Sequence, residues 1–284
     1  MTNKEIKELL EWVVPPKILE ILLKNLDRMI GFYKYDQKSF SGNSKIKNLE
    51  KNNRCFILGT GESTNKQDLT LLKNEISIGI NGFFTHKDIQ IISPKYYLVN
   101  SIFALHGDIL EESRYIDWLK AMDETLNNKT IMFMDISDKF YIEKYMLFNN
   151  KTIYWYQQEY YFKAKIEKIN LQRLEKGSSV SELAISVALH LGFESIYMLG
   201  IDHNWFNDGA YFDNERYNKY FKKDRATIIK ECNLDAEYQM LGHAKIFNKY
   251  KKLFNIRQNI FNVNSDQDTY VDVFPKKIYE KLFE

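Results

Sequence analysis

A glycine-rich turn follows the first strongly apolar run of the chain, and turns of this kind can bind phosphate. The run covers residues 55–58, and the turn contains Gly59, Thr60, Gly61 and Ser63. Because glycine has no Cβ, the backbone can approach a ligand closely and its N–H groups can face an anion. Thr64 replaces the third glycine of a dinucleotide fingerprint, and no Lys-Ser/Thr pair follows, so neither a standard NAD site nor a Walker-type loop is predicted. The turn is either a phosphate cradle or a plain tight turn.

Two asparagines stand directly after predicted strands. Asn81 follows residues 76–80, and Asn100 follows residues 96–99. Ligands of open α/β sheets gather at the carboxyl ends of strands, and an amide offers a donor and an acceptor to a base or sugar. Both asparagines are therefore predicted to contact a nucleotide. The alternative for Asn81 is that Asn81-Gly82 only turns the chain.

A serine pair and an aspartate add polar groups to the same predicted edge. Ser178 and Ser179 precede a predicted helix over residues 181–191, and Asp202 follows a buried apolar run at residues 195–199. The serines either cap the helix or help its N–H groups to accept a phosphate or carboxylate. Asp202 can hold a sugar hydroxyl, bind a metal ion or cap the next turn.

His243 is the candidate general base. It follows Gly242 near the start of a predicted helix over residues 236–254. A helix N-terminus disfavours a cation, so a histidine there is expected to be neutral at pH 7 and able to accept a proton. The alternative is a structural histidine. No group of His, Asp and Glu has metal-ligand spacing, so no metal site is predicted.

The elements that must position these residues alternate between strands and helices. Short apolar runs, which predict strands, fall at residues 55–58, 76–80, 96–99, 130–134, 151–155, 195–199 and 259–263. Strands that alternate with helices predict an α/β fold with a Rossmann-like, mostly parallel sheet and helices on both faces.

The domain organisation follows from a change of rhythm near residue 50. Residues 1–50 are predicted to form an N-terminal helical segment, broken at Pro15-Pro16 and ending in a polar linker over residues 39–47. Residues 51–284 are predicted to form a single nucleotide-binding catalytic domain. At 284 residues the chain is long enough to bury a full core.

Composition excludes several functional classes. A net charge of +2 with interleaved charges gives no support for a nucleic-acid partner. Two cysteines, Cys55 and Cys232, make a disulfide framework or a cysteine metal site unexpected. The chain shows no signal peptide and no apolar run long enough to span a membrane, which predicts a cytoplasmic protein, either free or peripherally bound at the inner face of the plasma membrane.

The order of these motifs resembles bacterial sialyltransferases of glycosyltransferase family 42. It is also similar to the 6-hydroxymethylpterin pyrophosphokinase-like (MptE-like) domain of archaeal pterin enzymes and Maf-type flagellin glycosyltransferases. The resemblance covers roughly residues 54–265, and its most specific piece is LGFESIYMLGID at residues 191–202. Both relatives share that piece, so it indicates the fold more than the reaction.

The resemblance to the sialyltransferases implies roles for individual residues. His243 matches the catalytic histidine, and Tyr211 matches one of two tyrosines that meet the departing phosphate. The family serine falls at Val180, beside the two serines noted above, and a family arginine falls near Lys176. The positions that match the site for CMP-sialic acid are Thr60, Gly61, Ser63, Asn81, Asn100 and Ser179.

The implied function is transfer of a sugar, a nonulosonic acid, from a CMP-activated donor to a surface-glycan or glycolipid acceptor, with His243 as general base. Such transfer needs no metal cofactor, because the CMP leaving group carries a single ester phosphate. One alternative is an MptE-like pyrophosphokinase that uses ATP and Mg²⁺, with Asp202 and Asp208 as ligands. Another is a non-catalytic nucleotide-binding module in a glycan pathway. Assembly as a homo-oligomer stays open.

Overall fold

The structure is a computed structural model that describes residues 18, 37–101, 112–159, 169–204, 236–264, 269 and 271–284. Its centre is a seven-stranded sheet with the strand order β5-β4-β3-β2-β1-β8-β9, in which every neighbouring pair is parallel. These strands are β1 (Arg54–Leu58), β2 (Ser77–Ile80), β3 (Tyr96–Val99), β4 (Ile131–Asp135), β5 (Ile153–Tyr156), β8 (Ser195–Leu199) and β9 (Ile260–Asn262). A separate parallel pair joins β6 (Gln158–Glu159) to β7 (Leu174–Glu175).

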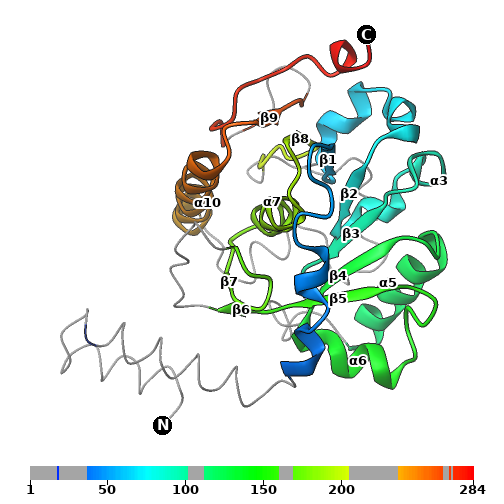
Figure 1. Cartoon of the computed structure of the whole chain (residues 1–284). Coiled ribbons are helices and arrows are strands. Elements are labelled where there is room, and N and C mark those ends of the chain that lie inside the picture. Colours follow the sequence, from blue (N-terminus) through cyan, green and yellow to red (C-terminus); the bar gives the residue numbers. More distant parts are fainter. Residues whose placement is uncertain are drawn as a thin grey trace.

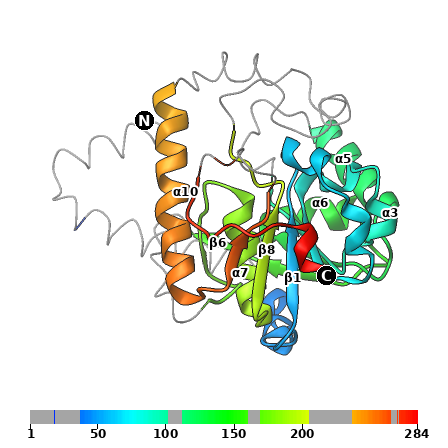
Figure 2. The ribbon, with the colours of Figure 1, turned by 90° about the horizontal axis from the view of Figure 1, so that it is seen from above.

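Helices cover both faces of the sheet. They are α3 (Ile89–Ile92), α5 (Glu112–Thr125), α6 (Lys139–Lys144), α7 (Val180–Leu191) and α10 (Ala236–Ile256). Figure 1 shows α7 and α10 on one side of the sheet and α3, α5 and α6 on the other, and Figure 2 shows the same division from above. The predicted α/β class, with a mostly parallel sheet between helices, is confirmed.

Strand β1 shows how one apolar run supplies two cores. Neighbouring side chains of a strand point to opposite faces. Phe56 and Leu58 pack in the core beneath α3, α5 and α6, whereas Cys55 and Ile57 pack in the core beneath α7 and α10. All four side chains are fully buried. Burial on both faces explains why such strands are continuously apolar instead of alternating.

The predicted strands all exist, with ends that shift by no more than two residues from the predicted ones. The two predicted helices correspond to α7 and α10. Helix α5 was not predicted, although Tyr115, Ile116, Leu119 and Met122 bury one side of it. These four positions have the spacing of an amphipathic helix, so the signal was present in the sequence.

The polar run over residues 39–47 is not a linker. Phe40 and Ile46 are buried, and the Asn43 amide nitrogen donates a 2.9 Å hydrogen bond to the backbone oxygen of Trp155. Two short 3₁₀ helices, Gln37–Phe40 and Asn43–Ile46, pack this segment onto the sheet domain. The interpretation failed because polarity alone does not show that a segment is free of the core. Apart from Ile18, residues 1–36 lie outside the described residues, and so does the predicted helical segment there.

The order of strands reverses direction next to β1. Strands β2 to β5 follow one another on one side of β1, whereas β8 and β9 lie on its other side. The carboxyl ends of β1 and β8 therefore form the switch point of a doubly wound sheet, where ligands of open α/β sheets bind. The predicted site residues Gly59 and Asp202 follow these two strand ends.

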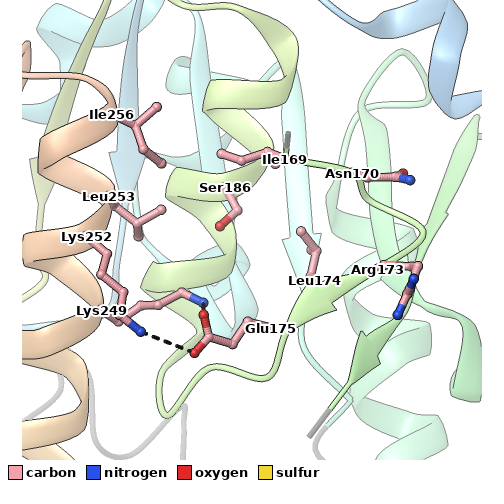
Figure 3. Close-up of a pocket in the computed structure, with 10 residues that line it drawn as sticks. All are labelled: Ile169, Asn170, Arg173, Leu174, Glu175, Ser186, Lys249, Lys252, Leu253 and Ile256. Atoms are coloured by element: carbon pink, nitrogen blue, oxygen red, sulfur yellow. Dashed lines mark hydrogen bonds and ion pairs between the residues drawn. The ribbon is translucent and has the colours of Figure 1, made fainter. Parts of the chain in front are cut away.

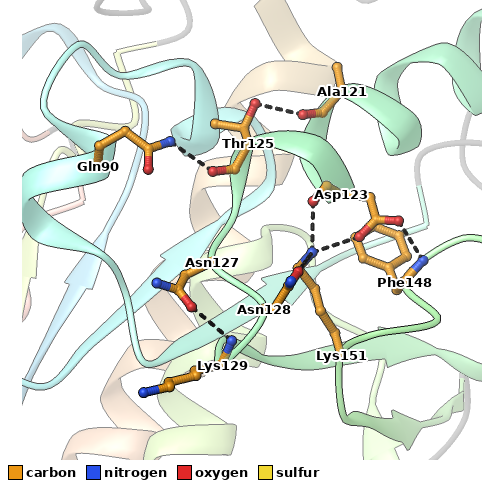
Figure 4. A network of polar contacts seen from close by, with 9 residues as sticks. All are labelled: Gln90, Ala121, Asp123, Thr125, Asn127, Asn128, Lys129, Phe148 and Lys151. Atoms are coloured by element: carbon orange, nitrogen blue, oxygen red, sulfur yellow. Dashed lines mark hydrogen bonds and ion pairs between the residues drawn. The ribbon is translucent and has the colours of Figure 1, made fainter.

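The opposite edge, at the amino ends of the strands, carries a buried ion pair. Lys151 precedes β5, and its Nζ atom lies 2.6 Å from Asp123 Oδ1 and 2.7 Å from the Asp123 backbone oxygen. The Lys151 side chain is 1% exposed, and the Phe148 N–H donates to the other carboxylate oxygen of Asp123 (Figure 4). Every charge in this group has a protein partner, so the group fastens the end of α5 to β5.

Among the helices in the described part of the chain, none is both long and apolar enough to cross a bilayer.

Candidate functional site at the carboxyl edge of the sheet

A clamp between Ser63 and Asp202 joins the two turns at the switch point. The Ser63 N–H donates a 2.9 Å hydrogen bond to Asp202 Oδ2, and the Ser63 hydroxyl lies 2.5 Å from Asp202 Oδ1. Both residues are buried, with Asp202 only 2% exposed. Each carboxylate oxygen therefore has a protein donor. Asp202 thus holds the turn after β1, whereas the sequence suggested a sugar hydroxyl, a metal ion or the turn that follows Asp202 as its partner.

The two glycines of the turn have a structural cause. A Cβ atom on Gly61 would lie 2.3 Å from Asp202 Oδ2, and one on Gly59 would lie 2.3 Å from the Gly200 backbone oxygen. The N–H groups of Gly59 and Gly61 donate to the backbone oxygens of Leu199 and Gly200, both at 2.8 Å. These amides are directed at β8 and not at a bound phosphate. The glycines are thus required for close packing of the two turns, which favours the tight-turn alternative.

The two predicted asparagines hold each other at the ends of β2 and β3. Asn81 Oδ1 accepts a 2.9 Å hydrogen bond from the Asn100 N–H. Asn81 has a positive φ of 43°, which asparagine tolerates better than most residues, and its backbone oxygen accepts from the Tyr97 hydroxyl. Asn81 therefore does turn the chain, as its alternative held, and it also positions Asn100.

Asn100 leads into a polar network that sequence reasoning missed. Its Oδ1 atom accepts a 2.8 Å hydrogen bond from Gln158 Nε2, which also donates to Asp135 Oδ2 at 3.0 Å. Since Oδ1 faces Gln158, the Asn100 amide group presents its NH₂ as a donor on the other side. Asp135 is the last residue of β4 and directly follows the strand predicted at residues 130–134. That position, like those of Asn81 and Asn100, was the signal that could have found it.

Beside it lies a second buried carboxyl, Asp138. Its Oδ1 atom accepts a 2.6 Å hydrogen bond from the Ser101 hydroxyl, and the buried Tyr115 hydroxyl also interacts with this carboxyl group. Burial raises the pKa of Asp138 to about 7, and the negative charge of Asp135 acts in the same direction. Burial also raises the pKa of Asp135. The carboxyl ends of β3 and β4 thus hold a carboxyl group that titrates near neutral pH.

The predicted serines begin α7 as expected. Ser179 is the N-cap, and its hydroxyl accepts from the Ser181 N–H. The Ser178 N–H donates 2.8 Å to Glu182 Oε2. Burial raises the pKa of Glu182 to about 7, although the nearby ammonium of Lys249 acts in the opposite direction. The capping alternative is therefore correct for Ser179, and Ser178 holds a buried acid in place.

A chain of hydrogen bonds runs from α7 through α10 to the end of β8. The Tyr250 hydroxyl donates to Ser181 Oγ at 2.6 Å and lies 2.8 Å from His203 Nε2. Because the tyrosine proton is used toward Ser181, His203 Nε2 must be the donor in the second bond. Burial lowers the pKa of His203 to about 3, so this ring is neutral. His203 also has a positive φ of 53°, an unusual conformation for a residue other than glycine, at the carboxyl edge of the sheet.

His243 is attached to this same point. Its Nε2 atom lies 2.6 Å from the backbone oxygen of His203, the residue directly after Asp202. A carbonyl oxygen only accepts, so Nε2 carries a proton, and in the Nε2–H tautomer Nδ1 is the acceptor atom. Helix α10 begins at Ala236, the residue predicted, so His243 lies about two turns inside it. A helix dipole acts mainly within the first turn, so the effect of the helix N-terminus expected from the sequence does not apply to His243.

Three further predicted residues are Thr60, Tyr211 and Asp208. Thr60 lies between Gly59 and Gly61 and is half-buried. Tyr211 and Asp208 lie outside the described residues. Within the described ranges, no three His, Cys, Asp or Glu side chains come together in a way that could hold a metal ion.

The edge therefore offers an amide donor at Asn100, hydroxyls at the start of α7, buried acids near neutral pKa and a histidine of defined tautomer. Such groups can bind a polar ligand and transfer a proton. No protein-family model matches the sequence, and no curated protein gives a significant match.

Proposed function

We propose that the chain is a glycosyltransferase that moves a sugar from a CMP-activated donor to a surface-glycan or glycolipid acceptor. The sugar proposed is a nonulosonic acid, and the reaction takes place in the cytoplasm or at the inner face of the plasma membrane. The observation that carries the proposal is the bond between His243 Nε2 and the His203 backbone oxygen. This bond fastens a histidine, as the Nε2–H tautomer, beside the switch point.

In this proposal His243 Nδ1 accepts the proton of the attacking acceptor hydroxyl. General base catalysis of this kind contributes about 10²–10⁴-fold to the rate. The acceptor oxygen forms the new bond to the anomeric carbon of the donor, and the bond from that carbon to the CMP phosphate oxygen breaks. Tyr211, matched through the resemblance, donates a hydrogen bond to the departing phosphate.

Nucleotide binding falls to residues around the switch point. The Asn100 amide can donate to the acceptor atoms of a cytosine edge. The hydroxyls of Thr60 and Ser179 are half-buried and suit a ribose or phosphate. The Ser63–Asp202 clamp and the glycines beside it position the two turns and need not touch the ligand themselves.

Nucleotide preference tests the proposal. CMP at 100 times its dissociation constant adds about 2.7 kcal/mol to the free energy of unfolding and raises the melting temperature by several degrees. We expect CMP and CDP to stabilise the chain without Mg²⁺, more than UDP or ATP does. Stabilisation seen only with ATP and Mg²⁺ would favour pyrophosphate transfer instead. Binding of CMP without transfer to any glycan acceptor would leave a non-catalytic nucleotide-binding module.

A further inference from the structure

A groove lies between the first turn of α7, strand β7 and helix α10, outside the proposed transfer reaction. Its volume is about 250 Å³, comparable to a small phosphorylated sugar. The side chains that matter here are Lys176, Ser178, Glu182, Lys245, Lys249 and Lys252. The three α10 lysines point to a different side of the helix from His243, because residues 245, 249 and 252 recur at helical spacing.

The groove has an excess of positive charge. Lys249 Nζ lies 2.8 Å from Glu175 Oε2, and Lys252 Nζ lies 3.6 Å from Glu175 Oε1. Figure 3 shows both lysines beside Glu175 at the wall that the groove shares with a smaller adjoining pocket. One carboxylate thus faces two ammonium groups. Lys176 and the exposed Lys245 add two further positive charges to the same lining.

Glu182 adds one buried carboxylate oxygen that has no hydrogen-bond partner among the described residues. The residue is 2% exposed, and its Oε2 atom accepts the Ser178 N–H, but its Oε1 atom makes no hydrogen bond within the described structure. An unpaired buried carboxylate oxygen is costly, so a site that keeps one calls for an explanation. Oε1 is closed to solvent in this conformation, and Glu182 lines the groove, so a ligand hydroxyl supplies the missing donor once the carboxylate turns toward the groove.

We propose that this groove binds a phosphorylated sugar, whose phosphate lies among the lysines and whose hydroxyl donates to Glu182 Oε1. Lysine ammonium groups bind phosphate as point charges, and the first turn of α7 adds the positive end of a helix dipole. Glu182 then selects a molecule that carries hydroxyl groups over a bare anion. The proposal does not depend on the transfer reaction at His243, since binding in the groove can be measured without turnover.

Isothermal titration calorimetry at pH 8 tests this site with three probes: glucose 6-phosphate, glucose and inorganic phosphate. We expect glucose 6-phosphate to bind at least tenfold more tightly than either of the other two. Glu182→Gln keeps an oxygen for the Ser178 N–H but places an NH₂ group toward the ligand. This variant should bind glucose 6-phosphate about tenfold more weakly, because a hydrogen bond to a charged group is lost. Its affinity for inorganic phosphate should not fall.

Lysine variants supply the matched control. Lys245→Gln should lower the affinity for glucose 6-phosphate and for inorganic phosphate several-fold. Lys251 is exposed on the same helix but lies outside the groove, so Lys251→Gln should change neither affinity. Equal effects of the two variants would reveal nonspecific charge attraction and overturn the site. Tight binding of inorganic phosphate with no gain from the sugar would overturn the role of Glu182. His243→Ala should leave all three affinities unchanged, so failure here and failure of the proposed function are separate results.

Discussion

The Nε2 atom of His243 lies 2.6 Å from the backbone oxygen of His203, one residue beyond the aspartate that clamps the glycine turn. If His243 is the general base, His243→Ala should lower turnover by about 10²-fold or more, whereas the affinity for CMP should change little. The base acts on the acceptor hydroxyl and not on the nucleotide. Steady-state transfer rates and CMP titration together measure the two effects.

A structural role for His243 predicts the reverse. Loss of its bond to His203 would then lower the melting temperature while the specific activity of the folded protein stays unchanged. His190, on α7, offers a comparison, because its ring also lies against backbone oxygens. Its Nε2 and Nδ1 atoms contact the backbone oxygens of Asn43 and Ile169. His190→Ala should cost stability without a selective loss of turnover.

Tyr211→Phe tests the leaving-group end of the same reaction. In the proposed reaction the Tyr211 hydroxyl is a donor to the departing phosphate, so we expect its removal to slow turnover even with a more reactive acceptor. CMP release measured in single-turnover experiments checks this expectation. An unchanged rate would remove Tyr211 from the catalytic assignment.

The clamp at the switch point predicts a strong effect of a single methyl group. Gly61→Ala places a Cβ atom 2.3 Å from Asp202 Oδ2, so the carboxylate must leave Ser63. We expect a loss of about 2–3 kcal/mol in the free energy of unfolding, measured with urea. Gly42→Ala is the control. Its φ of −70° suits alanine, and the nearest contact is a Tyr154 ring atom at 3.0 Å that can move.

Asp138 predicts a pH dependence of stability. Its pKa is raised from 3.8 in the unfolded chain to about 7 by burial. As pH rises between these values, the unfolded chain releases a proton that the folded chain retains, so stability falls across this window. Asp138→Asn should remove this fall. The free energy of unfolding of the variant, relative to that of the wild type, should therefore increase by on the order of 3 kcal/mol from pH 4 to pH 8.

Urea unfolding at several pH values measures the Asp138 effect. Asp117→Asn serves as the control, because the Asp117 side chain is 67% exposed and should give parallel curves for variant and wild type. If Asp138→Asn is also parallel to the wild type, the group does not titrate within that window.

Lys151 separates structural charge from functional charge. Lys151→Met leaves the Asp123 carboxylate without its buried partner. We therefore expect the free energy of unfolding, measured with urea, to fall by about 3 kcal/mol. CMP affinity of the folded fraction should not change, because this pair lies at the amino edge of the sheet. Lys129→Met, an exposed neighbour in Figure 4, should alter neither quantity.

The strands were predictable because their sequences carry the signal locally. Residues 96–99 and 195–199 were predicted with the bounds found in β3 and β8, since both are short apolar runs between polar residues. The contact of Asn81 with Asn100 also follows from this pattern, because the two residues end neighbouring parallel strands.

Other parts of the site depend on pairings that no local pattern reveals. Ser63 and Asp202 are 139 positions apart, and only the placement of β8 beside β1 explains why the glycines must lack a Cβ. The tautomer of His243, on α10, depends on the backbone oxygen of His203, which lies beyond the end of β8. The start of this helix at Ala236 was predicted, but His243 lies too far from it for the helix dipole to act on its ring.

The central place of β1 has a consequence for synthesis of the chain. One edge of β1 pairs with β2, which emerges soon afterwards, but the other edge pairs with β8, about 140 residues later. Until β8 is made, a strand with four consecutive apolar residues has one row of unpaired N–H and C=O groups, which is a template for wrong pairing. Slow translation between residues 100 and 195 would prolong that exposure. A nascent chain stalled there should bind chaperones or aggregate more readily than one that extends past residue 264.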